Sequence, residues 1–426
     1  MKARILDFIK KPTSKDVVVN TLGNYLNVFF VALFALILVR IMSPSEYGVL
    51  SILLGIAYVL ANILDFGTTA TIYSYLPPLI EKRTKRLYVF IKTTFFYQSL
   101  LSLIVIVVLL FAFPYLDRVF FKTHAPRSEF YITTFSVLFF IWQNFVCNIL
   151  FAAKKFFKAN LYINIANVLK TILIFYLAFT RTVSVGTVIF VFGIVGPAIF
   201  FFLLFLEKKD FIFVLLKSKV KREEFRFGYT LTYFFANQFF NLGLRMDLFL
   251  LSYFGLQNGV GYYGLAQKII LSIIATVVSI TQVLSPNFSR IKTKKEASSQ
   301  FRTGFLYLLL PAGLFTLLIF TPDQVFDLFF TAKFSQTAAI ARSLAIPFIL
   351  FTLGSLPLLF ILYTFKKPRF VLYSNILFFL GMTIGCYIFI PIYGVFAPAY
   401  VIGFSLIGPV LIQSIASYYE YKKLPA

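Results

Sequence analysis

Cysteine and histidine, two of the commonest ligands in metal sites, are almost absent from this chain. Among 426 residues there are two cysteines, Cys147 and Cys386, and one histidine, His124. Both cysteines lie in apolar stretches, which excludes a disulfide scaffold and a cysteine-based metal site. No G-x-x-x-x-G-K-[ST] motif is present to hold the phosphates of ATP. We therefore expect no cofactor, no metal and no bound nucleotide.

Charged residues are also scarce. Asp, Glu, Lys and Arg make up 13% of the chain, about half the share found in soluble domains, whereas hydrophobic residues make up 60%. Apolar stretches of about 20 residues or more recur along the whole sequence, and each is long enough for a helix to cross ~30 Å of hydrocarbon. This composition indicates an all-α polytopic membrane protein.

Polar breaks separate twelve apolar stretches, and each predicts one transmembrane helix. The first stretch is too long for the core of a signal peptide and lacks a small-residue cleavage site, so we count it as a helix. The predicted helix cores are 17–41, 47–66, 88–113, 128–153, 159–180, 184–206, 229–251, 259–285, 303–321, 338–364, 370–391 and 395–417.

Lysine and arginine alternate in number from one connection to the next. The connections on the side of the N-terminus hold 29 of these residues and those on the other side hold 5. The positive-inside rule then places both termini in the cytoplasm. We expect the chain to lie in the inner (cytoplasmic) membrane of the cell. Topology thus explains most of the formal net charge of +24. We expect membrane lipids, and no nucleic acid, as partners of this charge.

The two halves of the sequence repeat one another. Asn24 and Asn237 are separated by half the length of the chain, and a Lys-Lys pair and a Gly-Pro pair recur at almost the same separation. With six helices each, the halves start on the same side, which predicts two six-helix bundles related by a parallel pseudo-two-fold repeat. The predicted domains are an N-terminal bundle, 1–206, a basic cytoplasmic linker, 207–228, and a C-terminal bundle, 229–426.

The repeated Gly-Pro pairs, Gly196-Pro197 and Gly408-Pro409, lie deep in the last helix of each half. Proline removes a backbone hydrogen bond and bends a helix, and the neighbouring glycine adds freedom. We interpret these residues as hinges that let the bundles rock between inward-facing and outward-facing states.

Six cations lie within the predicted helices, where an ionised side chain costs about 2.5–3.5 kcal/mol. Arg40 and Lys92 are close to helix ends and can extend to the lipid headgroups. The other four lie further in and predict a wet, protein-lined cavity: Lys170, Arg245, Lys268 and Arg342.

Asparagines accompany these cations at helical spacing. Such polar stripes cannot face lipid without a large energetic cost, so they predict either hydrogen bonds between helices or a shared cavity. Because stripes occur in the first helix of both halves, we favour a cavity, with Asn24, Asn237 and Asn241 at the ligand. The stripes comprise Asn20, Asn24 and Asn27, then Asn160, Asn164, Asn167 and Lys170, and then Asn237, Asn241 and Arg245.

Asp65 and Asp247 are the only carboxylates well within the predicted helices. Arg245 and Asp247 are two residues apart and do not share a helix face, so the cavity keeps a net positive charge and its ligand should be an anion that carries phosphate. Both acids are candidates for coupling to an ion gradient. The alternative for Asp65 is a helix-end residue that binds nearby backbone N–H groups.

Several motifs resemble one known family. They are Ser43-Pro44-Ser45-Glu46-Tyr47-Gly48, Asp65-Phe66-Gly67, Arg245-Met246-Asp247-Leu248-Phe249-Leu250-Leu251, Gly261-Tyr262-Tyr263 and Ala266. In order and spacing they resemble the polysaccharide-transport family of O-antigen (Wzx-type) flippases, within the multidrug/oligosaccharidyl-lipid/polysaccharide (MOP) superfamily. The resemblance extends over the whole chain in helix number and half-repeat.

This resemblance implies two six-helix bundles around a cationic cavity that moves an undecaprenyl-pyrophosphate-linked oligosaccharide from the inner to the outer leaflet. It also implies other polysaccharide assembly proteins, such as a polymerase or a chain-length regulator, as partners. Members of the family often have a basic residue soon after the Asp-x-Gly motif. This sequence departs from that pattern, because no basic residue occurs from Thr68 to Leu76. The sugar that is handled therefore stays open.

A drug antiporter and a membrane enzyme are the two alternative functions. A cation-coupled drug antiporter of the same superfamily needs carboxylates in the membrane, and six cations against two acids in the predicted helices argue against it. A membrane polysaccharide polymerase or ligase typically needs a large external loop with acid and base residues, whereas the longest external connection has about 15 residues, by the span boundaries above. We therefore expect a flippase and no enzyme.

Overall fold

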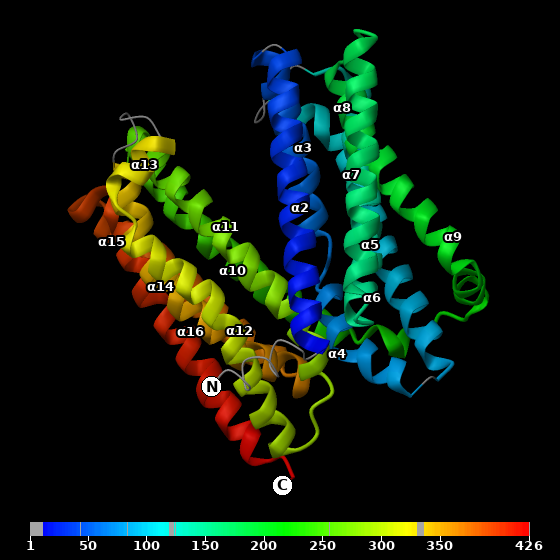
Figure 1. Cartoon of the computed structure of the whole chain (residues 1–426), viewed down its shortest axis with the longest axis vertical. Helices are drawn as coiled ribbons and strands as arrows, with labels where there is room; N and C mark the ends of the chain where they lie inside the picture. The colour runs from blue at the N-terminus through cyan, green and yellow to red at the C-terminus, as the bar shows by residue number, and fades with distance from the viewer. Residues whose placement is uncertain are drawn as a thin grey trace. The chain divides into compact units, whose positions relative to one another are not determined.

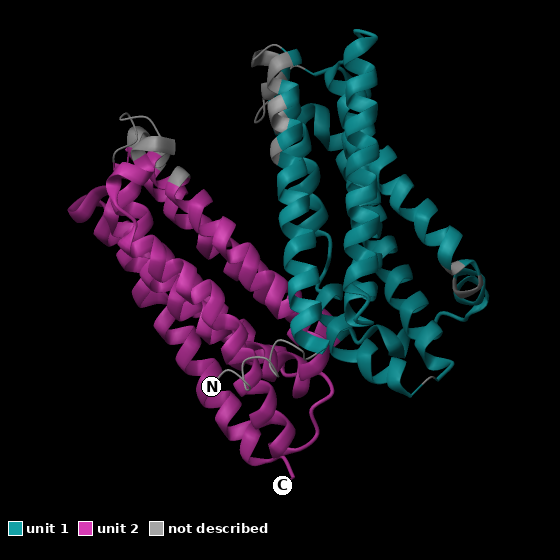
Figure 2. Ribbon diagram, viewed as in Figure 1, with its two compact units in different colours: residues 1–227 teal, residues 228–426 magenta. Residues whose placement is uncertain are grey.

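The residues that the structure describes form helices and no strand. In the computed structural model these residues are 12–42, 44–82, 84–118, 123, 125–254, 256–329 and 336–425. His124 lies outside them. The helices divide into two compact units, residues 1–227 and residues 228–426 (Figure 2).

Unit 1 holds the first six predicted helices (Figure 1). Its elements are α2 (Pro12–Ile41), α3 (Pro44–Ile63), α4 (Thr68–Glu81), α5 (Arg86–Leu116), α6 (Arg127–Ala152), α7 (Phe156–Phe179), α8 (Val185–Phe190), the π-helical turn η2 (Val191–Val195), α9 (Gly196–Lys217) and the 3-10 helix η3 (Arg222–Phe225).

Unit 2 holds the other six. Its elements are α10 (Phe227–Tyr253), α11 (Gln257–Phe288), α12 (Lys294–Phe320), α13 (Asp323–Phe329), α14 (Gln336–Leu359), the π-helical turn η5 (Phe360–Thr364), α15 (Pro368–Tyr393), the 3-10 helix η6 (Gly394–Phe396) and α16 (Ala397–Lys422).

All twelve predicted stretches lie mainly within these helices, so the all-α fold with two six-helix bundles is confirmed. By length and hydropathy, eight helical segments of the described residues could each cross a membrane, and a bent pair would make nine. Those eight count α15 to α16 as one segment and leave out α2 and α10, the first helices of the two units.

The second predicted helix ends where expected, but the chain then forms another helix where the sequence predicts a connection. Phe66 and Gly67 take left-handed backbone angles, with φ of 49° and 80°, and α4 follows at an angle of 48° to the second part of α3. Only glycine adopts this conformation without strain, which explains why the break falls here. The polar residues and two prolines of α4 are typical of a connection, so the sequence does not predict this helix.

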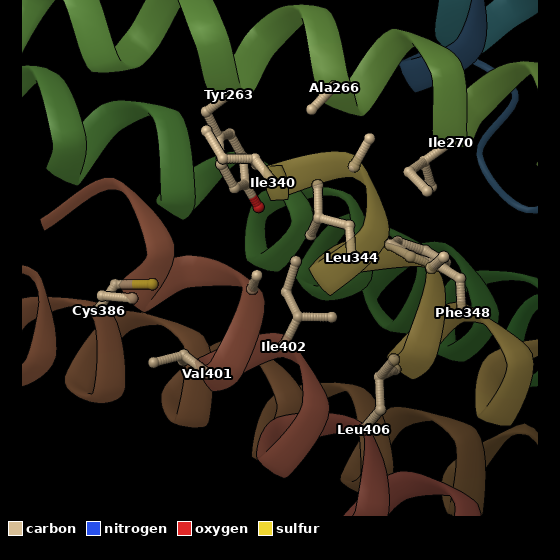
Figure 3. Packing of buried hydrophobic residues seen from close by; sticks show 14 of the residues in the cluster. Tyr263, Ala266, Ile270, Ile340, Leu344, Phe348, Cys386, Val401, Ile402 and Leu406 are labelled. Atoms are coloured by element: carbon tan, nitrogen blue, oxygen red, sulfur yellow. The ribbon is translucent and has the colours of Figure 1, made fainter. Parts of the chain in front are cut away.

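The packing in unit 2 is centred on α14, which lies against α11, α12 and α16. Figure 3 shows Tyr263, Ile270, Ile340, Leu344 and Phe348 interdigitating in one buried cluster. Between helices in lipid, such packing is held by dispersion contacts rather than by the hydrophobic effect. The cluster therefore depends on close fit.

Equivalent turns follow the fourth helix of each unit. Lys154 and Lys366, separated by almost half of the chain, both have left-handed backbones, with φ of 59° and 57°. Just beyond each turn, a lysine binds a carboxylate of the last long helix. Lys158 pairs with Glu207 in unit 1, and Lys367 pairs with Glu420 in unit 2 at 2.9 Å. The two carboxylates are separated by half of the chain but the two lysines are not, so the repeat keeps an ion pair here with lysines at different positions.

The sequence predicts a basic connection at 207–228, but α9 continues to Lys217, so the connection to α10 is only 218–226 and contains η3. This shorter connection is held against α5 of unit 1. The ammonium group of Lys92 donates to the carbonyl oxygens of Leu216 at 2.5 Å and of Ser218 at 2.6 Å, which caps the end of α9. Arg86 binds Glu224 at 2.6 Å. Lys92 is therefore a helix-capping residue, and the expectation that it extends to lipid headgroups is corrected.

Replacing Lys92 by Met should loosen the end of α9, because a hydrogen bond to a charged group contributes about 1.5–3 kcal/mol. In detergent, trypsin should then cut between Lys217 and Arg222 faster than in the unmodified protein. Lys85→Met is the matched control, because Lys85 is exposed at the start of α5. Equal cleavage rates in all three proteins would contradict the capping role.

Candidate functional site

The asparagine stripes of α2 and α7 bind each other. The side-chain amide of Asn160 donates to Asn20 at 3.0 Å, and that of Asn167 donates to Asn27 at 2.9 Å. Asn164 donates to the carbonyl oxygen of Gly23 at 3.3 Å. A Cβ atom at Gly23 would overlap Asn160, so glycine is needed for this close approach. These stripes are interhelical hydrogen bonds, the alternative to a cavity that the sequence left open.

The corresponding helices of unit 2 keep one of these contacts. Asn375 of α15 donates to the carbonyl oxygen of Ala236 at 2.9 Å, and Ala236 is the counterpart of Gly23 in the half-repeat. On the same helix, α10, Asn237 is half-buried and Asn241 is exposed. Asparagines of the α2 stripe thus form hydrogen bonds with asparagines of the neighbouring helix, whereas the α10 stripe is partly exposed. Asn24 is half-buried on α2.

Arg245 and Lys268 lie on α10 and α11, and the side chains of both are exposed. Neither forms a salt bridge with a carboxylate among the described residues. Asn241 lies one turn before Arg245, and Ser272 lies one turn after Lys268 and is also exposed. Unit 2 thus carries two exposed cations on adjacent helices, each with a polar neighbour and neither in a salt bridge among the described residues.

Asp247 points the other way, into the unit. It is completely buried and accepts hydrogen bonds from the hydroxyl group of Tyr263 at 2.8 Å and from the amide of Gln267 at 3.1 Å. It also accepts from the backbone N–H of Leu248 at 2.6 Å. Both side-chain donors are on α11, so this carboxylate joins α10 to α11. The sequence singled out Tyr263 within a motif but did not identify it or Gln267 as a partner of Asp247.

Lys170 lies half-buried on α7 between two aromatic rings. Its nitrogen is 5.3 Å from the ring centre of Phe34 and 5.1 Å from that of Phe192, which are cation–π contacts. A Cβ atom on Gly196 would come within 2.9 Å of the Lys170 side chain. Gly196 and Pro197 directly follow the π-helical turn, so Lys170 lies against the predicted hinge.

The second Gly-Pro pair has a different setting. Gly408 and Pro409 lie inside α16, which is one continuous α-helix, and Gly408 approaches Leu377 of α15. The irregular helix that accompanies the first pair is therefore absent at the second, within the part of the chain that the structure describes.

Arg342 is neutralised at one end of unit 2. Its guanidinium group binds Asp323 at 2.7 Å and donates to the carbonyl oxygen of Thr321 at 2.6 and 3.1 Å. It also lies 5.5 Å from the ring of Phe326. These contacts connect α14 to the turn between α12 and α13.

Asp65 lies at the break between α3 and α4. It accepts from the hydroxyl groups of Thr68 at 2.8 Å and Thr69 at 3.0 Å, and from the backbone N–H of Thr69 at 3.3 Å. Asn148 of α6 donates to Thr69 at 2.7 Å and accepts from Tyr73 at 3.3 Å. These are the contacts of a helix-end residue. Asn148 was not singled out from the sequence, although Asn144 lies one turn before it in the same helix.

Tyr263→Phe should destabilise unit 2, because the buried carboxylate of Asp247 then loses one of its donors. An unsatisfied buried group costs about 1–3 kcal/mol, and more if it is charged. The midpoint of thermal unfolding in detergent should fall clearly below that of Tyr253→Phe, whose ring is 71% exposed. Equal midpoints in the two variants would show that the bond contributes little.

Comparison with known proteins gives the family. A family model described as "Polysaccharide biosynthesis protein" matches residues 13–292, and no curated protein matches the sequence.

The fold is similar to that of solved transporters at low sequence identity. An outward-facing multidrug resistance transporter of the MATE family, in the MOP superfamily, is 14% identical over 97% of both chains, with a TM-score of 0.77. A MOP superfamily transporter from Pyrococcus furiosus, described as having a binding pocket of reverse polarity, is 14% identical over 97% of this chain and 96% of its own, with a TM-score of 0.72. The fold is that of a multi-pass membrane transporter, and the chain belongs to the polysaccharide biosynthesis protein family.

Proposed function

We propose that this protein is a flippase that moves a polyprenyl-(pyro)phosphate-linked oligosaccharide from the inner to the outer leaflet by alternating access. In this proposal it lies in the inner (cytoplasmic) membrane with both termini in the cytoplasm. A polymerase or a chain-length regulator would be a partner that receives the product.

The observation that carries the proposal is the pair of exposed cations on α10 and α11. Arg245 and Lys268 lie within two of the predicted membrane helices and form no salt bridge with a carboxylate among the described residues. An unpaired charge in a membrane is stable only beside water or an ionic ligand. The cation-binding alternative would have to use Asp247 or Asp65, and both carboxylates already accept hydrogen bonds from neighbouring donors. We therefore favour an anionic ligand over a drug cation.

We assign the polar residues beside these cations to the same site. Asn237 and Asn241 share α10 with Arg245 and can donate to phosphate or sugar oxygens. For Asn24 and Lys170, which belong to unit 1, contact with the ligand stays a prediction from the sequence. Arg342 contributes less, because Asp323 balances its charge.

Arg245→Ala and Lys268→Ala should each abolish translocation and leave the protein level unchanged, because both side chains are exposed and unpaired. Arg245→Lys and Lys268→Arg should keep most of the translocation activity if the ligand is bound through the positive charge alone. The measurement is the exposure of a lipid-linked oligosaccharide on the outer face of reconstituted vesicles. Arg302→Ala, which removes an exposed cation near the start of α12, is the control. Full activity of both alanine variants would refute the assignment, and export of an organic cation instead would support the antiporter.

Pro197→Ala should slow translocation more than it weakens ligand binding. The new N–H group lets the π-helical turn close into a regular helix, which removes the irregular backbone that we propose as the hinge. Pro409→Ala is the matched variant and should have the smaller effect, because its helix is already continuous. Equal losses of binding and translocation in Pro197→Ala would indicate a folding defect instead of a hinge.

A further inference from the structure

Helix α3 has one face that nothing in unit 1 covers. The opposite face packs into the unit through Leu50, Leu53, Ala57 and Ala61. At about 100° per residue, the uncovered face has Gly55 and Asn62 along its centre. Tyr58 forms one edge, and Ile52 and Val59 form the other. We call Gly55, Tyr58 and Asn62 the α3 strip.

The ring of Tyr58 is supported from behind. It stacks on Phe140 of α6 with 4.7 Å between ring centres and 18° between planes, and Phe140 is itself buried in a cluster with Ala57, Val137 and Ile141. Tyr58 is nevertheless 45% exposed. One side of the ring is therefore fixed by the protein while much of the residue stays accessible, which makes a rigid, flat platform.

Gly55 leaves space beside this platform. A Cβ atom there would meet nothing within 4 Å, so neither close packing nor an unusual backbone requires glycine at this position. Glycine inside a helix costs about 0.5–1 kcal/mol relative to alanine. Because packing in the unit does not explain this cost, we attribute it to a ligand that occupies the space.

Asn62 lies one turn beyond Tyr58 and is exposed. It is about 27 Å along α3 from Pro44, at 1.5 Å per residue, and so within the membrane if this bent pair spans it. An amide group there cannot face lipid tails without losing its hydrogen bonds, so it needs a polar ligand or water. Glu46 is the only charged residue of α3, and the next cation along the chain is Lys82. The strip is polar and aromatic but neutral.

We propose that the α3 strip binds the carbohydrate part of the substrate, an inference that rests on the proposed function. A pyranose ring has a face of C–H groups with partial positive charge, which suits the negative face of an aromatic ring. Tyr58 supplies that ring, Gly55 leaves room for the sugar, and the amide of Asn62 binds hydroxyl groups. The strip itself carries no charge, so it would recognise the sugar and not the pyrophosphate.

The test compares two probes that differ only in the sugar. The full-length protein in lipid nanodiscs is titrated with polyprenyl pyrophosphate and with the same lipid carrying a tetrasaccharide. Gly55→Leu and Tyr58→Ala should weaken binding of the glycosylated probe about tenfold and leave the bare probe unaffected, whereas Tyr58→Phe should keep both affinities. Arg245→Ala should weaken both probes.

Two control variants separate the strip from general damage. A Cβ atom at Gly313 of α12 would likewise meet nothing within 4 Å, so Gly313→Leu adds the same side chain elsewhere. Tyr176→Ala removes a tyrosine of α7 that is 62% exposed. Neither should change either affinity.

The inference is overturned if Gly55→Leu and Tyr58→Ala leave the glycosylated probe unaffected, or if they weaken both probes equally. Because Gly55→Leu fills open space and Tyr58→Phe keeps the stack on Phe140, misfolding cannot account for the whole pattern. If the strip variants lose binding of the glycosylated probe only, and Arg245→Ala has no effect on either probe, the result would support sugar binding at the strip and contradict the anion site. If the unmodified protein binds neither probe, both proposals are wrong.

Discussion

Hydrocarbon offers no hydrogen-bond partners, so a polar side chain inside a membrane helix must find one in the protein, in water or in a ligand. Many of the polar contacts described above follow from this constraint. Asparagines of α2 and α7 pair with each other, Asp247 takes its donors from α11, and Arg342 takes Asp323. Other polar side chains of the described residues stay exposed, among them Arg245 and Lys268, and for these we propose a ligand as the partner.

The repeat gives both units one plan but different chemistry. In the half-repeat, Phe34 of unit 1 corresponds to Asp247 of unit 2. Phe34 carries the cation–π contact to Lys170, whereas Asp247 joins two helices through Tyr263. The helix that follows is broken at Gly67 in unit 1 and continuous as α11 in unit 2. The same scaffold thus holds a neutral exposed strip on α3 and a cationic surface on α10 and α11.

Patterns that depend on many residues could be predicted from the sequence. Twelve hydrophobic stretches and the half-repeat depend on composition over many positions, and the repeat holds even for the left-handed turns at Lys154 and Lys366. The sequence identified the four deep cations, but it could not show which of them are paired with a carboxylate. Whether Arg342 is paired and Arg245 is not depends on contacts with residues far away in sequence or in neighbouring helices.

The wrong predictions came from short sequence patterns that are compatible with two structures. The segment after Gly67 contains threonines and two prolines, which are typical of a connection, yet it forms the buried helix α4. Lys92 resembles a side chain that extends to lipid, because its partners, the carbonyl groups at the end of α9, lie far later in the sequence. The asparagine stripes allowed two interpretations, and only the neighbouring helix decided between them.

The separation of charge from sugar recognition also bears on the energy of transport under the proposed function. A pyrophosphate-linked lipid carries about two negative charges, and a potential that is negative inside drives them outward by about 2.3 kcal/mol per charge per 100 mV. Two charges across ~100 mV give close to ~5 kcal/mol, a bias of about a thousandfold. Arg245 and Lys268 are fixed to helices and can bind this charge without crossing the membrane with it. A neutral strip on α3 adds specificity without adding a second cationic site from which the pyrophosphate must be released.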